Sequence, residues 1–80
     1  MRLDKYLKVT RLIKRRTIAN EACDAGKVTV NDKVARASYD IKVDDVIEIK
    51  LGIRPLKVKV LSVSEYATKE NASENYIVIE

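Results

Sequence analysis

The stretch that decides the fold is residues 1–30, which read Met-Arg-Leu-Asp-Lys-Tyr-Leu-Lys-Val-Thr-Arg-Leu-Ile-Lys-Arg-Arg-Thr-Ile-Ala-Asn-Glu-Ala-Cys-Asp-Ala-Gly-Lys-Val-Thr-Val. Its first sixteen positions hold seven of the sixteen lysines and arginines of the chain, against the single acid Asp4. This segment therefore carries a charge of +6, whereas the whole chain of 80 residues carries only +4. The positive charge is concentrated at one end of the sequence, and the rest of the chain is slightly acidic.

A first short helix is predicted from the spacing of Leu3, Tyr6 and Leu7 at i, i+3 and i+4, which places all three on one face. Asp4 falls in the first turn, where a carboxylate favours the positive helix end. It is also placed to orient Arg2 or Arg11 through a charge-assisted hydrogen bond. After this helix, a bend with apolar residues 12 and 13 inward is expected to present the basic residues 14–16 outward together.

A second helix is expected to begin within residues 15–17, with Thr17 as its cap, and to run to Ala25. Gly26 ends it, because glycine commonly adopts the left-handed conformation that follows a helix. The residues predicted to face inward are Ile18, Ala19, Ala22 and Cys23. The basic residues at the start of this helix oppose its dipole, so helix stability does not explain them and a polyanionic partner does.

From residue 27 the apolar period changes from helical to the alternation of strands. Residues 27–30 and 34–36 are expected to form a hairpin around the turn Asn31-Asp32-Lys33, which places Lys27, Lys33 and Arg36 near one another. Further strands are predicted at 46–51, ended by Gly52, at 56–63, and at 75–79. Residues 64–74 are expected to form a loop with a helical turn near 69–72. The fold predicted is α+β, two short N-terminal helices packed on a small, mostly antiparallel sheet of four or five strands.

The concentrated cationic segment indicates a polyanionic partner, either nucleic acid or an anionic membrane. Nucleic acid is favoured because a membrane-surface helix would carry a broad apolar face with Trp or Phe, and the chain contains neither. The alternative is that the basic residues form only a solvent-exposed helix face. Such a face usually carries interspersed charges of both signs, unlike this segment. No membrane partner is therefore expected.

Composition excludes several kinds of chemistry. The chain has no histidine and the single cysteine Cys23, so a zinc site, a histidine general base and an internal disulfide are excluded. Cys23 lies in the apolar pattern of the second helix and is interpreted as a small buried side chain. No catalytic site, cofactor or metal is expected, and the chain is predicted not to be an enzyme. Without a long apolar run it is expected to lack a signal peptide and a membrane span, and to be cytoplasmic.

The motifs taken together resemble a known RNA-binding module. They are Met1-Arg2-Leu3-Asp4-Lys5-Tyr6-Leu7, then residues 11–19 (Arg-Leu-Ile-Lys-Arg-Arg-Thr-Ile-Ala), residues 26–31 (Gly-Lys-Val-Thr-Val-Asn) and residues 41–45 (Ile-Lys-Val-Asp-Asp). The combination is similar to the RNA-binding domain first defined in ribosomal protein S-four. The resemblance implies one RNA-binding domain over 1–80, with a core motif over 1–51 and a strand extension over 52–80.

Within that group the chain is similar to the ribosome-associated quality-control protein P (RqcP) family and the fifteen-kilodalton heat-shock protein family. The resemblance implies binding to large ribosomal subunits obstructed by peptidyl-tRNA, through contacts to rRNA and tRNA that hold the tRNA in the peptidyl site during alanine tailing. It implies RqcH as a further partner on the same subunit, and a monomer is expected. The RNA-binding residues carried over by position are Arg2, Arg11, Lys14, Arg15, Arg16, Lys27, Lys33 and Arg36.

Two departures from the family pattern stand out. The hairpin turn that is usually Asn-Gly is Asn31-Asp32 here, which adds an anion near the expected RNA surface. The usual Lys-Pro-Gly-Asp is residues 42–45, Lys-Val-Asp-Asp, which is expected to change the turn shape only.

Recognition should be mainly of RNA shape and backbone, with Tyr6 expected in the core rather than stacked on a base. The open alternatives are a general structured-RNA or ribosome-binding heat-shock-type factor, a DNA-binding regulator, a domain of an RNA-modifying enzyme, and an interaction module whose acidic C-terminal end binds a protein.

Overall fold

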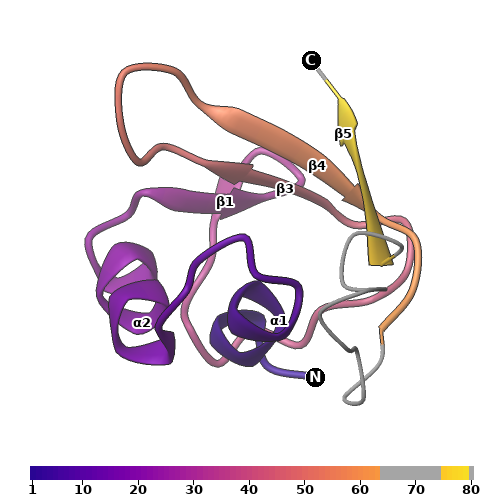
Figure 1. Cartoon of the computed structure of the whole chain (residues 1–80), viewed down its shortest axis with the longest axis horizontal. Helices are drawn as coiled ribbons and strands as arrows, with labels where there is room; N and C mark the ends of the chain where they lie inside the picture. The colour runs from indigo at the N-terminus through magenta and orange to yellow at the C-terminus, as the bar shows by residue number, and fades with distance from the viewer. Residues whose placement is uncertain (64–74, 80) are drawn as a thin grey trace.

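The computed structural model describes residues 1–63 and 75–79 of the chain. Within them, the helices α1 (Leu3–Val9) and α2 (Arg16–Asp24) precede the strands β1 (Val28–Val30), β2 (Lys33–Val34), β3 (Val46–Ile49), β4 (Leu56–Val60) and β5 (Tyr76–Ile79). The strands pair antiparallel in the order β2-β1-β3-β4-β5. Both helices lie on one side of this sheet (Figure 1). The predicted α+β fold is therefore confirmed.

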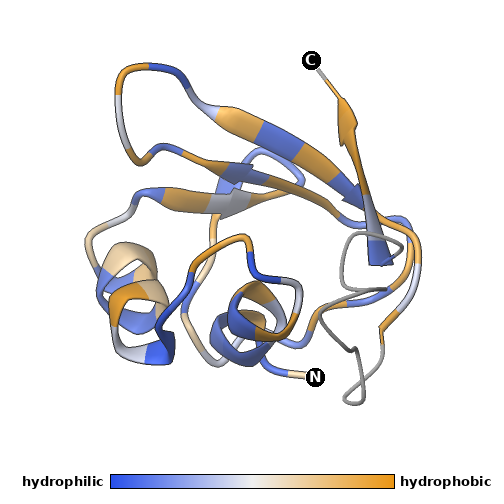
Figure 2. Ribbon diagram, viewed as in Figure 1, coloured by the Kyte–Doolittle hydropathy of each residue, from blue (hydrophilic) through white to orange (hydrophobic). Residues whose placement is uncertain are grey.

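The core lies between the helices and the sheet. The predicted inner face of α1, Leu3, Tyr6 and Leu7, is almost fully buried. Alternate residues of the central strands face it, and Figure 2 shows the alternation of apolar and polar residues along β4. Val58 and Val60 of that strand are buried, whereas Lys57 and Lys59, which alternate with them, remain partly exposed, as the strand period predicts.

The connection between the helices directs the basic residues outward. Helix α1 ends at Val9, and the buried hydroxyl of Thr10 donates a hydrogen bond to the carbonyl oxygen of Tyr6 (2.7 Å). Arg11 then adopts a left-handed conformation (φ 63°), which reverses the chain and lets Ile13 enter the core. The following three residues, 14–16, are all exposed, as the predicted bend requires.

Two predictions for α2 are wrong. Thr17 is not its cap: Arg15 occupies that position without a side-chain cap, and its carbonyl oxygen accepts the N–H of Ala19 (3.0 Å), so the helix begins earlier. Ile18 does not face inward and is 44% exposed. The buried face consists of Ala19, Ala22 and Cys23 at i, i+3 and i+4, which turns Ile18 to the flank of the helix. The predicted stop at Gly26 is confirmed by its φ of 73°.

The strand ends also differ from prediction. Leu51 was expected in a strand, but β3 ends at Ile49, and Leu51 is 38% exposed. Strand β4 ends at Val60 rather than at residue 63, because the next two N–H groups turn to the carbonyl oxygen of Asn75 (2.9 and 3.2 Å). The helical turn predicted near 69–72 lies outside the described residues.

The predicted β1–β2 hairpin forms, but its turn consists of Asn31 and Asp32 alone: Lys33 belongs to β2, which ends at Val34 rather than at residue 36. Both turn residues have positive φ (52° and 69°), the conformation of a two-residue turn that suits the twist of the strands. The Asn31 side chain donates to Asp45 (3.1 Å) and accepts the N–H of Val46 (3.0 Å), which fastens the turn to the start of β3. The chain thus keeps its hairpin without the usual glycine.

Candidate nucleic-acid interface

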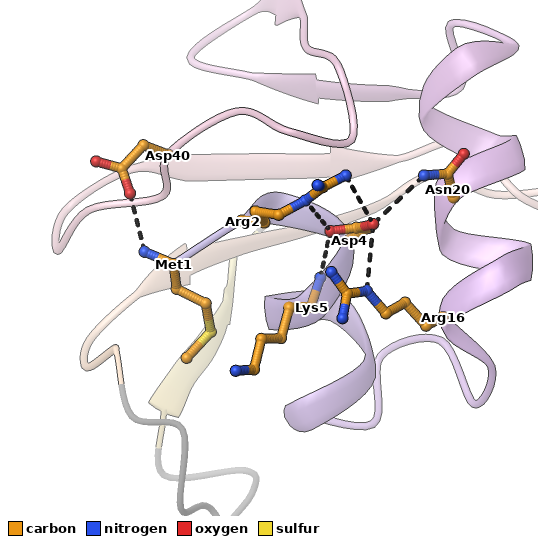
Figure 3. Close-up of polar contacts among 7 residues, drawn as sticks. All are labelled: Met1, Arg2, Asp4, Lys5, Arg16, Asn20 and Asp40. Atoms are coloured by element: carbon orange, nitrogen blue, oxygen red, sulfur yellow. Dashed lines mark hydrogen bonds and ion pairs between the residues drawn. The ribbon is translucent and has the colours of Figure 1, made fainter.

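The centre of the candidate site is a buried carboxylate that collects two arginines. Asp4 is 2% exposed, and its oxygens accept the Nε (3.2 Å) and Nη2 (3.4 Å) of Arg2, the Nε of Arg16 (3.3 Å) and the Nδ2 of Asn20 (3.4 Å). The backbone N–H of Lys5 donates to the same carboxylate (2.8 Å). Figure 3 shows these groups converging from α1 and α2. We call Arg2, Asp4, Arg16 and Asn20 the Asp4 cluster.

The protonation of Asp4 follows from these contacts. Burial by itself raises the pKa of this carboxyl, but hydrogen bonds from Asn20, Arg16 and the Lys5 backbone outweigh burial and lower the pKa below its ordinary value. Asp4 is therefore ionised at neutral pH. One negative charge faces two positive charges, so the cluster keeps a net charge of +1 while its guanidinium groups are held in place.

The guanidinium groups remain available to a ligand. The side chains of Arg2 and Arg16 are 51% and 47% exposed, although Asp4 between them is buried. Within the described residues, Arg16 donates only its Nε–H, so its two Nη groups point to no protein acceptor. A planar fork with free N–H groups is suited to bidentate recognition of phosphate.

The surface around the cluster is hollowed. An open depression of about 460 Å³ is lined by Arg2, Asp4, Arg16, Thr17, Asn20 and Glu21. The first turn of α2 borders it, contains no acidic residue and lacks a side-chain cap. Uncapped N–H groups and the positive helix end add to the attraction of the arginines for an anion.

Arg2 is also fixed from the other side by the chain around residue 40. The amino group of Met1 forms an ion pair with Asp40 (2.8 Å), and Arg2 and Asp40 form an antiparallel bridge. The neighbouring N–H of Leu3 donates to the carbonyl oxygen of Tyr39 (2.8 Å). The hydrogen bond and charge of the amino group lower the pKa of Asp40. Backbone contacts on both sides therefore set the position of Arg2.

The other predicted RNA-binding residues lie at different places on the surface. Arg11, Lys14 and Arg15 are exposed and have no acidic partner within residues 1–63 and 75–79. Arg36 lies one residue before Ala37, whose carbonyl oxygen accepts the N–H of Asp4 (3.1 Å), so it lies beside the Asp4 cluster.

The hairpin was expected to bring Lys27, Lys33 and Arg36 together. Lys33 instead pairs with Val30 at the turn end of β1, while Lys27 precedes β1 at the opposite end. There Lys27 lines a groove with Ile18 and Leu51. The length of β1 therefore separates Lys27 from Lys33.

The sequence predicted a hydrogen bond of Asp4 with Arg2 or Arg11. It did not predict the hydrogen bonds that Asp4 accepts from Arg16 and Asn20. In the structure Arg11 does not contact Asp4, because the left-handed turn carries it past the end of α1. The signal that was available is the i, i+4 spacing of Arg16 and Asn20, which places both on one face of α2.

The remaining chemistry of the described residues is limited. They contain no cluster of histidine, cysteine, aspartate or glutamate able to hold a metal ion. Cys23 is buried, and burial, with smaller effects of Asp4 and Asp24, raises the pKa of its thiol to about 11, so it is protonated at neutral pH. In the same part of the chain, neither helix has the length or apolar character needed to cross a bilayer.

The chain is similar in sequence to proteins of a known family. The family model of the S4 domain matches residues 1–47. The chain is 51% identical to the RQC P-site tRNA stabilizing factor of Streptococcus pneumoniae, over 99% of this chain and 90% of that protein. It is 42% identical to the factor of the same name in Bacillus subtilis, over 99% and 92%. A heat shock protein 15 homolog of Haemophilus influenzae is 31% identical over 81% of this chain and 50% of its own length.

Solved structures show the same fold. The trimeric structure of Vibrio cholerae heat shock protein 15 superposes with a TM-score of 0.92 at 25% identity, covering 99% of this chain and 81% of that one. The solution structure of HP1423 gives a TM-score of 0.84 at 26% identity, over 100% and 98%. The predicted resemblance to the S-four-type module is confirmed.

Proposed function

Since the chain belongs to the S4-domain family and, within it, to the RQC P-site tRNA stabilizing factors, we propose that it acts in ribosome-associated quality control. It binds large ribosomal subunits that hold a peptidyl-tRNA, contacts rRNA and tRNA together, and stabilises the tRNA in the peptidyl site while alanines are added. The observation that supports this most is the pair of half-exposed arginines held by the buried Asp4.

The residues that we assign to RNA share exposure and positive charge. Arg2 and Arg16 bind phosphate or stack on bases as oriented groups, because Asp4 fixes their forks. The other members of the interface are Arg11, Lys14, Arg15, Lys27, Lys33 and Arg36. Orienting an arginine before binding reduces the side-chain entropy lost on binding, which raises the affinity for a correctly spaced phosphate pair.

The proposed output is positioning without chemistry. The relatives are named as stabilizing factors, and the described residues supply neither a reactive thiol nor a metal cluster. Holding two RNA molecules in one arrangement slows the dissociation of either, because each contact makes the other intramolecular. We infer that the chain works as one RNA-binding domain and as a monomer in the cytoplasm, beside RqcH on the same subunit.

The experiment is sedimentation of the tagged protein in a cell lysate through a sucrose gradient, followed by sequencing of the co-purified RNA. Wild type is expected with large subunits and tRNA, and Arg16→Ala in the light fractions. Lys59→Ala is the matched control, because it removes one half-exposed cation, paired with Asp44 (3.7 Å), from the face of β4 opposite to the buried Val58 and Val60. Equal sedimentation of all three proteins would refute the assignment to the arginines.

The similarity to the heat shock protein 15 fold favours a second candidate, a general ribosome-binding factor. That function predicts equal recovery of large subunits with and without tRNA, whereas the proposed function predicts enrichment of subunits carrying tRNA. A DNA-binding regulator is disfavoured, because Asn20 of α2 is already bonded to Asp4 and the exposed residues near it, Glu21 and Asp24, are acidic.

A further inference from the structure

A second hollow lies at the β2 edge of the sheet. It has a volume of about 460 Å³ and is lined by Val30, Asn31, Lys33, Val34, Ala35 and Tyr39. Two apolar side chains that normally avoid water are open here, since Val34 is 66% exposed and Tyr39 is 40% exposed. Elsewhere in the described chain Tyr6 is buried and Tyr76 is half-buried, so Tyr39 is the most accessible of these aromatic rings.

The walls of this pocket are held in place by the hairpin. Ala35 is 6% exposed, and its N–H donates to the carbonyl oxygen of Val28 (3.2 Å). Asn31 is fastened to β3 through both ends of its amide group. The N–H of Tyr39 donates to the carbonyl oxygen of Arg36 (3.0 Å), which closes a turn and fixes the start of the tyrosine side chain. The pocket is therefore largely formed before any ligand arrives.

The register of the hairpin gives the pocket polar groups as well. Val30 pairs with Lys33 and Val28 is bonded to Ala35, so the intervening pair of Thr29 and Val34 is the one that exchanges no hydrogen bonds. The backbone N–H and C=O of Val34 consequently point away from β1, toward the open edge. A donor and an acceptor thus stand side by side next to an exposed ring.

The pocket adjoins the Asp4 cluster through the backbone. The carbonyl oxygen of Tyr39 accepts the N–H of Leu3, and the next residue, Asp40, bridges Arg2. The backbone segments that carry Arg2 and Tyr39 are therefore adjacent, as contact of one RNA strand with both residues requires.

We propose that this pocket binds one unstacked nucleobase of the RNA, with the ring of Tyr39 stacked on its face. Val34 supplies the apolar wall, its backbone N–H and C=O face the polar edge of the base, and Lys33 at the rim contacts the adjoining phosphate. This inference rests on the proposed function and adds a base-specific contact to an interface expected to recognise mainly backbone and shape. Base stacking on an aromatic side chain contributes about 1–3 kcal/mol per base.

A nucleobase fits this pocket better than the other ligands that its parts could attract. A phosphate alone would require several converging cations, and Lys33 is the only one among the lining residues. A peptide adding to the sheet would need a long edge for its hydrogen bonds, whereas β2 is two residues long. A planar base with donors and acceptors on its rim matches both the exposed ring and the short polar edge.

The test uses two fluorescein-labelled pentamers with equal charge, one built of abasic ribose-phosphate units and one with a single central adenine. Fluorescence anisotropy at low salt measures the dissociation constants for wild type, Tyr39→Ala, Tyr39→Phe and Arg16→Ala. Wild type is expected to bind the adenine pentamer about 5- to 150-fold more tightly than the abasic one. Tyr39→Phe keeps this preference because it keeps the ring, and Tyr39→Ala loses it while binding the abasic pentamer unchanged.

The outcomes separate this inference from the function on which it rests. Equal binding of both pentamers by wild type, or an equal loss for both in Tyr39→Ala, would overturn the base site while leaving RNA binding through the arginines intact. Weakening of both pentamers in Arg16→Ala supports the proposed function independently. If wild type bound neither pentamer, both proposals would fail. Circular dichroism of Tyr39→Ala shows whether the exposed substitution leaves the fold unchanged.

Discussion

At the scale of single residues, Asp4 links stability to the expected RNA contacts. It is a buried acid in a surface that should attract anions, and it accepts hydrogen bonds from both α1 and α2. Without a negative charge at this position, two guanidinium groups would repel each other and turn into solvent. The same carboxylate therefore joins the helices and sets the spacing of the arginines.

We expect Asp4→Asn to lower the free energy of unfolding at pH 7 by about 1–3 kcal/mol, because a buried group loses charge-assisted hydrogen bonds. The pKa of Asp4 is lowered in the folded state from an ordinary value of 3.8, so its contribution is complete above that value. It is lost as the pH falls through the lower folded-state pKa. Urea denaturation of both proteins should show a constant difference from pH 7 to pH 5 that shrinks below pH 4.

The control for this prediction is Asp24→Asn, which removes an exposed acid at the end of α2. Its effect on the free energy of unfolding should stay within about 0.5 kcal/mol. A difference between Asp4→Asn and wild type that persisted unchanged below pH 3 would show that packing, rather than the ionised carboxylate, accounts for the loss.

At the scale of secondary-structure elements, the hairpin tolerates a strained turn. Asp32 has a φ of 69° where glycine would carry no steric cost, whereas the neighbouring Asn31 is held by its own side-chain hydrogen bonds. Asp32→Gly should therefore raise the free energy of unfolding by about 0.5 kcal/mol. Asn31→Gly should lower it by about 1 kcal/mol, since two hydrogen bonds are lost.

Thermal or urea unfolding of these two variants measures the predicted opposite signs. Asp32→Gly also removes an anion from a turn next to Lys33, so it should tighten RNA binding slightly. If Asp32→Gly also lowered the free energy of unfolding, the conformational entropy that glycine adds to the unfolded chain would outweigh the backbone strain that it removes from the folded chain.

The arrangement of these helices and strands was partly predictable from the sequence. Leu3, Tyr6 and Leu7 fit one helical face and the strands fit a period of two, so the layers of the fold were predictable. In α2, Ile18 and Ala19 are adjacent and apolar, so both were predicted to face the core. In the structure the small residues face the core, which lets the helices approach closely, and Ile18 is turned outward.

The site was predictable in composition but not in arrangement. Charge alone indicated the exposed arginines. The i, i+4 spacing places Arg16 and Asn20 on one face of α2, but their contacts with Asp4 depend on how α1 and α2 pack. The separation of Lys27 from Lys33 likewise follows from the hairpin register. The pocket around Tyr39 forms between the predicted hairpin and a residue that follows it, and the period of the strands does not predict that contact.

At the scale of the whole molecule, the positive groups of the Asp4 cluster and residues 11–16 act together. Engaging roughly five phosphates should give a slope of about −3.5 to −4.5 in log affinity against log salt concentration. Arg16→Ala should reduce the magnitude of that slope by about 0.7–0.9, the share of one phosphate. Titrations of wild type and variant with large subunits at several salt concentrations measure both slopes, and equal slopes would show that Arg16 contacts no phosphate.

A chain that holds tRNA in the peptidyl site must slow the dissociation of that tRNA from the subunit. Large subunits carrying a labelled peptidyl-tRNA are incubated with wild type, with Arg16→Ala, with the control Lys59→Ala, or alone, and the loss of label is followed over time. We predict that wild type and Lys59→Ala slow the release of the tRNA, whereas Arg16→Ala leaves it at the rate of the subunits alone. Equal release with and without the wild-type protein, at concentrations that saturate the subunits, would show that the chain does not hold the tRNA.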